Sequence, residues 1–265
     1  MPLHKDDGIV LSKRAYGESD RIVRIFTLTS GKIGAIAKGA SKSQKRFMNT
    51  LEPFNHIAIE YFEKYGKGMV RIENAHVVEA NAGIEKTLKK VCTASFFTEF
   101  VDRLTKEREK NTSLFYLLKE VLTRIKDVEF DYHNILSYEL DMLECLGYMP
   151  NFSACVYCGK TMMNEDRLYF SSERGGILCP RCSRFIPHKA YPGEVIATLA
   201  GLKNGHPRPV PAIDGEETGD RPIAPHGAGN GVFEKNAREI MEGFVSFHLD
   251  VEFKSYRVLK SLFQF

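Results

Sequence analysis

Four cysteines in two matched pairs constrain this chain more than any other feature. The first pair, Cys155 and Cys158, is separated by twenty residues from the second pair, Cys179 and Cys182. A gap of two residues within each pair lets the chain form a tight turn that presents both sulfurs to one metal ion. Zn²⁺ prefers a closed tetrahedron of such ligands. The pattern therefore predicts one Zn²⁺ held by four thiolates, and because no position is left for water, we expect a structural ion.

The residues between the two pairs predict how the second pair returns to the first. Residues 168–170 and 176–178 have the composition of short strands, and the Glu-Arg-Gly at 173–175 is typical of a turn. This arrangement predicts a zinc ribbon. A thioredoxin-like redox pair and a pair of disulfides use the same residues, but two matched pairs at this spacing favour a metal. His188 is an alternative ligand, although an ordinary surface histidine fits its position better.

The first eighty residues have the pattern of β-strands. Runs rich in β-branched and aromatic residues alternate with turn residues, and they occupy positions 9–11, 22–28, 33–37, 57–62 and 69–78. In the fourth run, Ile57, Ile59 and Tyr61 alternate with polar residues, as a half-buried strand requires. Short strands of this number and spacing predict a small closed barrel. An OB-fold is the first candidate, and an SH3-like barrel is the second.

After Gly83 the hydrophobic period changes to that of helices. Apolar stripes predict helices near residues 97–104 and 114–125, a third helix that begins after Asp131 as its N-cap, and a last long helix over 233–249. The predicted fold class is therefore α+β, with a barrel followed by a helical domain into which the zinc ribbon is inserted.

The domains expected from these patterns follow one another along the chain. They are an OB-fold nucleic-acid-binding domain over residues 1–80, a first helical part over 81–150, a zinc-binding module over 151–190 and a second helical part over 191–265. Prolines and glycines gather between 204 and 231, and such a segment buries little apolar area, so we expect a flexible loop there.

A basic segment lies on the predicted barrel. Between residues 21 and 51 there are seven basic side chains and no acidic one. Barrels that bind single strands follow the phosphates with such cations and stack bases on aromatic rings. The residues expected to contact nucleic acid are Lys13, Arg14, Arg21, Lys38, Lys42, Lys45 and Arg46, with Tyr16 and Phe47 as the nearest rings.

Two alternatives to this interface remain open. The basic segment can be a loop that is merely solvated, because clusters of charge are common on protein surfaces. The next candidate for a nucleic-acid contact is the zinc module, through Arg174, Arg181 and Arg184.

The sequence contains no signature of common catalytic sites. It has no phosphate-binding loop, no nucleophile elbow and no paired-histidine metalloprotease helix. We therefore expect a binding protein and not an enzyme. No leader peptide and no apolar run of roughly twenty residues is found, so we expect no membrane association and a cytoplasmic, nucleoid-associated location.

Several short motifs occur in a fixed order. They are Leu-Ser-Lys-Arg-Ala-Tyr-Gly-Glu-Ser-Asp-Arg at 11–21, Gly-Lys at 31–32, Ala-Lys-Gly-Ala at 37–40, Leu-Glu-Pro-Phe at 51–54, Tyr-Glu-Leu-Asp-Met-Leu-Glu-Cys-Leu-Gly-Tyr-Met-Pro at 138–150 and Gly-Gly at 175–176. Together with the cysteine pairs, this order resembles the RecO family of bacterial recombination mediators. The resemblance extends over most of the chain, although the 204–231 segment looks longer than the family needs.

The resemblance implies both a fold and a function. It implies an N-terminal OB-fold, binding to single- and double-stranded DNA, and annealing of complementary strands. It also implies partnership with RecR and with the acidic C-terminal tail of single-strand binding protein, and indirectly with RecA in gap repair. An alternative from another class is a zinc-ribbon RNA-binding or ribosome-associated factor, since basic barrels and ribbons also serve RNA.

Overall fold

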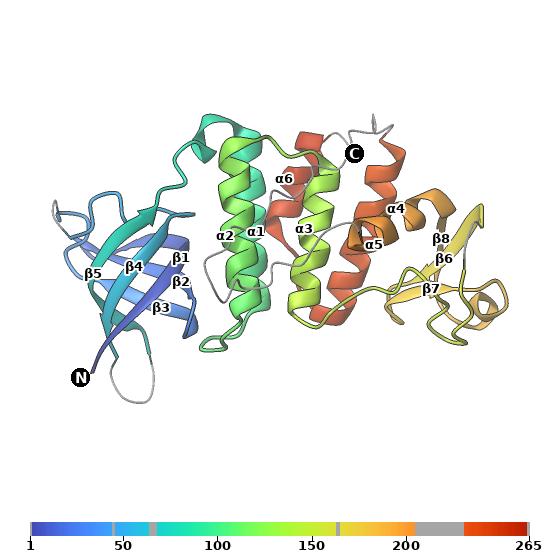
Figure 1. Cartoon of the computed structure of the whole chain (residues 1–265), viewed down its shortest axis with the longest axis horizontal. Coiled ribbons are helices and arrows are strands. Elements are labelled where there is room, and N and C mark those ends of the chain that lie inside the picture. Colours follow the sequence, from blue (N-terminus) through green and yellow to red (C-terminus); the bar gives the residue numbers. More distant parts are fainter. Residues whose placement is uncertain (1, 44–45, 64–67, 163–164, 205–230, 264–265) are drawn as a thin grey trace. The chain divides into compact units, whose positions relative to one another are not determined.

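In the computed structural model, the described part of the chain comprises residues 2–43, 46–63, 68–162, 165–204 and 231–263 (Figure 1). These residues form two compact units, one ending at Glu129 and the other beginning at Phe130. Lys45 and residues 205–230 of the expected loop lie outside the described part of the chain. The architecture is α+β, as predicted.

The first unit begins with a closed five-stranded barrel. Its strands are β1 (Leu3–Tyr16), β2 (Asp20–Thr27), β3 (Gly31–Ala37), β4 (His56–Phe62) and β5 (Val70–Glu79). The strand order is β1-β2-β3-β5-β4, and β1 closes the barrel by pairing with β4 as well as β2. All pairs are antiparallel except β3 with β5, which is parallel. This mixed barrel confirms the OB-fold and not the SH3-like alternative.

The pattern of the sequence explains the barrel core. In β4, Ile57, Ile59 and Tyr61 are buried as predicted, whereas Ala58 and Glu60 between them are partly exposed. β1 is longer than the sequence pattern indicated, because its first half pairs with β4 and its second half with β2, and its register with β2 shifts at a bulge between Val10 and Ser12. Such a bulge bends a strand, which here lets one strand serve two neighbours.

Two helices, α1 (Leu88–Leu104) and α2 (Thr112–Asp127), complete the first unit. They follow a short 3₁₀ turn at Ile84–Lys86. Thr87 and Asn111 cap the two helices by accepting hydrogen bonds from backbone N–H groups in the first turn. The ring of Phe115 on α2 lies 6.0 Å from that of His56, which is buried at the start of β4.

Two cations of the basic segment join the barrel to α1. The Lys32 side chain is buried, and its Nζ donates to the backbone carbonyls of Asp102 and Thr105. Arg24 Nη1 donates to Asp102 Oδ2 at 3.0 Å. Beside them, Gly31 has a φ of 66°, and a Cβ there would lie 2.2 Å from the carbonyl oxygen of Glu109. The Gly-Lys motif at 31–32 is thus explained by packing.

The second unit contains the cysteine pairs and the remaining helices. They are α3 (Tyr132–Cys145), α4 (Gly193–Asn204), α5 (Val232–Leu249) and α6 (Lys254–Phe263). Asp131 is the N-cap of α3, as predicted, and forms a reciprocal capping box with Asn134. The short helices α4 and α6 were not predicted from the sequence pattern.

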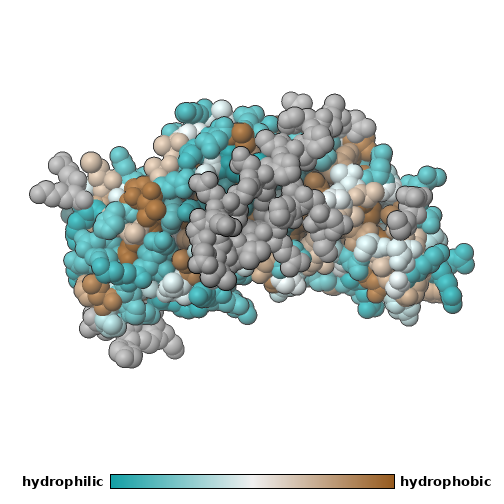
Figure 2. Space-filling view, in the orientation of Figure 1, coloured by the Kyte–Doolittle hydropathy of each residue, from teal (hydrophilic) through white to brown (hydrophobic). Residues whose placement is uncertain are grey.

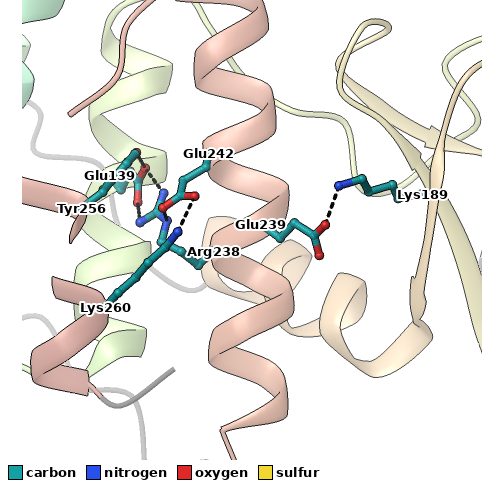
Figure 3. Close-up of polar contacts among 7 residues, drawn as sticks. All are labelled: Glu139, Lys189, Arg238, Glu239, Glu242, Tyr256 and Lys260. Carbon is teal, nitrogen blue, oxygen red and sulfur yellow. Dashed lines mark hydrogen bonds and ion pairs between the residues drawn. The ribbon is translucent and has the colours of Figure 1, made fainter. Parts of the chain in front are cut away.

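A buried ionic network joins three helices of this unit (Figure 3). Arg238 on α5 donates through both terminal nitrogens to Glu139 on α3, at 3.1 and 3.0 Å. Tyr256 on α6 donates its hydroxyl to the same carboxylate at 2.6 Å, and the Arg238 guanidinium lies 3.7 Å from the centre of the Tyr256 ring. The side chains of Arg238 and Glu139 are 1% and 0% exposed, so these charges balance each other away from water.

On the face drawn in Figure 2, apolar residues form separate patches within a hydrophilic surround. Among the described residues, no helix combines the length and the apolar character that crossing a membrane requires.

Candidate nucleic-acid interface and metal centre

The four-cysteine module (residues 151–162 and 165–192) is built on a small antiparallel sheet. Its strands are β6 (Arg167–Ser171), β7 (Gly176–Leu178) and β8 (Lys189–Pro192), in the order β7-β6-β8. The hairpin of β6 and β7 confirms the predicted ribbon, whereas β8 was not predicted. Val156 in the first cysteine turn donates its backbone N–H to Ile177 in β7 at 2.9 Å, which fixes that turn beside the strand leading to the second pair.

Gly176 shows why this close approach needs a glycine. A Cβ at that position would lie 2.7 Å from the carbonyl oxygen of Asn151 and 2.5 Å from the Val156 side chain. Those distances are shorter than any real Cβ contact, so a side chain would push the first cysteine turn away from β7. The second glycine of the Gly-Gly motif therefore sets the distance between the two cysteine pairs.

The four sulfurs have the geometry of a metal site. The ligand atoms of Cys155, Cys158, Cys179 and Cys182 all lie within 4.8 Å of one another. Cys158 Sγ and Cys179 Sγ are 3.7 Å apart, close to the edge of about 3.8 Å expected for a tetrahedron of Zn–S bonds of about 2.3 Å. A disulfide needs about 2.05 Å, and all the cysteines are free thiols. This geometry fits a metal ion and excludes the disulfide interpretation.

Backbone groups favour thiolates in the cluster. Burial raises the pKa of the Cys155 thiol, but N–H groups of Cys158, Cys179 and Tyr157 offset this effect and lower the pKa to about 6. The N–H of Cys182 lowers the pKa of Cys179. Burial and the neighbouring sulfurs raise the pKa of Cys182 to about 12. A cation that binds here must displace the protons of any thiols that are still protonated, so metal affinity falls as the pH falls.

The other candidate ligands lie outside this cluster. His188 Nδ1 donates to the backbone carbonyl of Ile186 at 2.9 Å, and the His188 ring packs edge-on against Tyr169. Cys92 and Cys145 belong to α1 and α3. The cluster is therefore formed by the four predicted cysteines.

On the barrel, three predicted cations line one groove. Lys13, Arg21 and Lys42 surround a cavity of about 530 Å³, which one acidic residue, Glu52, also lines and to which Ser41 and Asn49 add polar groups. Arg14 is exposed on β1 two residues before Tyr16. Neither Arg14, Arg21 nor Lys42 forms an ion pair with another described residue, whereas Lys13 donates to Glu52.

The other predicted cations of the barrel are engaged within the fold. Lys38 Nζ lies 2.7 Å from Asp20 Oδ2, and this contact is the main reason that the pKa of Asp20 is lowered. Arg46 donates to the carbonyl of Lys38 at 3.2 Å and lies 3.9 Å from Glu73 Oε1. The acidic partners come from β2 and β5, outside the acid-free part of the sequence.

The two aromatic candidates differ in exposure. The Tyr16 side chain is 51% exposed at the end of β1 and can offer its ring to a base. The Phe47 side chain is only 4% exposed and belongs to the barrel core. The expectation that Phe47 offers a stacking ring is therefore wrong, because the loop that carries it folds into the barrel.

The buried Glu139–Arg238 pair was missed at the sequence level. A signal was present, since Arg238 stands three and seven residues before Met241 and Val245, on the apolar face of its helix. A charged residue on such a face needs a buried partner, but the sequence alone does not identify which carboxylate supplies it.

The chain combines an OB-fold barrel, which has a groove lined by cations, with a helical unit that carries a four-cysteine cluster able to hold a metal ion. The family model described as Recombination protein O N terminal matches residues 1–81, and that described as Recombination protein O C terminal matches residues 85–200. The chain belongs to the RecO family of DNA repair proteins.

Similar proteins include three curated relatives named DNA repair protein RecO. The relative from Thermoanaerobacter sp. (strain X514) is 32% identical over 263 residues, covering 99% of both chains. That from Myxococcus xanthus is 34% identical over 212 residues, covering 80% of this chain and 86% of the relative. That from Listeria monocytogenes serovar 1/2a is 33% identical over 203 residues, covering 76% of both.

Proposed function

We propose that this chain is a recombination mediator that binds single- and double-stranded DNA and anneals complementary strands. With RecR, it helps to load RecA onto DNA coated by single-strand binding protein during gap repair. It contacts the acidic C-terminal tail of that protein and catalyses no covalent chemistry. Membership of the RecO family supports this role, and the cationic groove of the barrel is the observation that carries it.

The groove suits a phosphate chain for electrostatic reasons. Arg21 and Lys42 line it without an ion pair to any described residue, so both are available to phosphates. Each phosphate that a cation neutralises releases counterions from the nucleic acid, which gives affinity that depends strongly on salt and weakly on sequence. Arg14 extends the cationic surface, Lys13 adds less to it because it is paired with Glu52, and Tyr16 offers a ring for stacking.

The four cysteines hold one Zn²⁺ in this proposal, and the ion has a structural role. Four sulfur ligands at tetrahedral spacing suit Zn²⁺, and a closed set of ligands leaves no position for a substrate. The ion would join the two cysteine turns of the module, while the chain's other residues bind DNA and partner proteins.

A strand-annealing assay tests the proposal. The full-length protein is added to complementary oligonucleotides, either bare or coated with single-strand binding protein that has its C-terminal tail intact or deleted. We expect faster annealing of bare strands, and faster annealing of coated strands only when the tail is intact. Failure to anneal DNA, together with tight binding to structured RNA, would favour the RNA-binding alternative instead.

A further inference from the structure

Two aromatic rings of the four-cysteine module are exposed to solvent. Phe185 is 84% exposed and Tyr157 is 68% exposed, in a chain whose other phenylalanines are mostly buried. Tyr157 lies inside the first cysteine pair, directly before Cys158. Large apolar rings that remain in water without a packing role indicate a binding surface.

Both rings lie beside the sulfur cluster. The backbone N–H of Tyr157 points to the Cys155 sulfur, which places that residue in the metal-binding turn. Phe185 ends a 3₁₀ turn that begins at Cys182, and residues three apart in such a turn lie on the same side. Because the four sulfurs lie within 4.8 Å of one another, the two rings flank one site.

The charged side chains on the two segments that carry the rings are cationic. Residues 151–162 and 174–190 contain no acidic residue. Lys160, Arg181 and Arg184 are exposed there, and none of them forms an ion pair with another described residue. A Zn²⁺ ion with four thiolates carries a net charge of about −2. The positive charge of these three side chains therefore exceeds the negative charge of the zinc-bound cluster.

We propose that this surface, defined by Tyr157, Lys160, Arg181, Arg184 and Phe185, is a second DNA site that stacks unpaired bases. The inference rests on the proposed function, because it assigns a further contact with the same DNA. Exposed rings present flat faces, which every base can stack on, whereas a peptide anchor needs a concave pocket. The neighbouring cations supply the attraction for phosphates on either side of a stacked base.

The absence of tryptophan from the sequence allows a direct test. The variant F185W keeps an aromatic ring at the site and introduces a single tryptophan, whose fluorescence reports stacking. Y16W reports in the same way on the barrel, and F247W is the matched control, because Phe247 is 57% exposed on α5 but lies outside both surfaces. Each full-length variant is titrated with a thymidine oligonucleotide and with a duplex of equal length.

We expect saturable quenching of F185W by the single strand, little quenching by the duplex, and no change in F247W. The double variant Y157A/F185A should bind the single strand at least about fivefold more weakly. Its zinc content and melting temperature should match those of wild type, which separates a binding role from a structural one.

Three outcomes would overturn the inference. Quenching of Y16W but not F185W would restrict DNA to the barrel and leave the proposed function intact. A change in F185W fluorescence with protein concentration alone would assign the surface to a second copy of the chain. If neither tryptophan responded and wild-type protein did not bind DNA, the proposed function would fail as well.

Discussion

The barrel and the four-cysteine module differ in the share of their cations that are paired within the fold. The barrel segment over residues 21–51 carries seven basic side chains without an acid in sequence. In the fold, however, Asp20, Glu73 and Asp102 approach from other elements and engage Lys38, Arg46 and Arg24. The module has fewer cations, yet Arg181 and Arg184 keep their charges free of described partners.

This difference shows that a run of basic residues in the sequence does not by itself give a positively charged surface, because carboxylates from other elements can pair with those residues in the fold. A cation that has a fixed carboxylate partner offers little net field to a phosphate, because the partner repels the anion. We therefore expect DNA affinity to depend on the unpaired cations of both regions. The free energy of unfolding should depend instead on the cations that are buried and paired.

The largest effect that we predict concerns the metal ion, which should hold the four-cysteine module together but not the barrel. The substitution Cys179→Ser should abolish stable zinc binding and leave β6, β7 and β8 unprotected, because structural zinc contributes about 10–16 kcal/mol of folding free energy. The barrel should stay folded, since its core is apolar and independent of metal. Zinc content and hydrogen exchange, measured together, check both statements.

Cys92→Ser is the matched control for this variant, because Cys92 lies on α1 outside the cluster. It should retain one zinc ion per chain. Wild-type protein without zinc and with four readily alkylated thiols would contradict the metal assignment.

The next effect concerns Arg238, a paired cation in the helical unit. Replacing it with methionine leaves the Glu139 carboxylate buried without its partner, and the free energy of unfolding should fall by about 3–5 kcal/mol. Lys260→Met is the control, because Lys260 pairs with Glu242 at the surface and should contribute less than about 1 kcal/mol. Urea unfolding gives both values. Equal, small losses in the two variants would mean that the buried pair is not important for stability.

A smaller effect is expected at Lys32, which belongs to the basic segment but is buried. Lys32→Met removes the donor to the carbonyls of Asp102 and Thr105, and leaving these acceptors unpaired should cost about 1–3 kcal/mol. DNA affinity of the folded variant should not change. Lys42→Ala should behave oppositely, with unchanged stability and weaker binding. A large loss of DNA affinity in a folded Lys32→Met protein would show that this lysine is not purely structural.

The sequence predicted the elements that depend on local pattern. The alternation of Ile57, Ile59 and Tyr61 gave a strand, Asp131 gave a helix start, and the cysteine spacing gave the ribbon. These features are encoded within a few residues of each other, so no knowledge of the rest of the fold is needed.

Features that depend on distant residues could not be predicted in this way. The burial of Phe47 follows from how its loop returns to the barrel, and the pairing of Arg46 depends on Glu73, on another strand. The partner of Arg238 lies 99 residues earlier in the chain. The domain boundaries and the DNA-contacting residues stay predictions, because they depend on long-range contacts and on a ligand.

The salt dependence of oligonucleotide binding tests the central distinction between free and paired cations most directly. Two double variants are compared with wild type. The first combines Arg21→Ala and Lys42→Ala, and the second combines Lys38→Ala and Arg46→Ala. Circular dichroism is the control for folding. Each lost phosphate contact lowers the slope of log affinity against log salt by about 0.7 on a single strand. We expect a decrease of about 1.4 in the first variant and a much smaller one in the second. Equal decreases in the two variants, or the larger decrease in the second, would contradict the account.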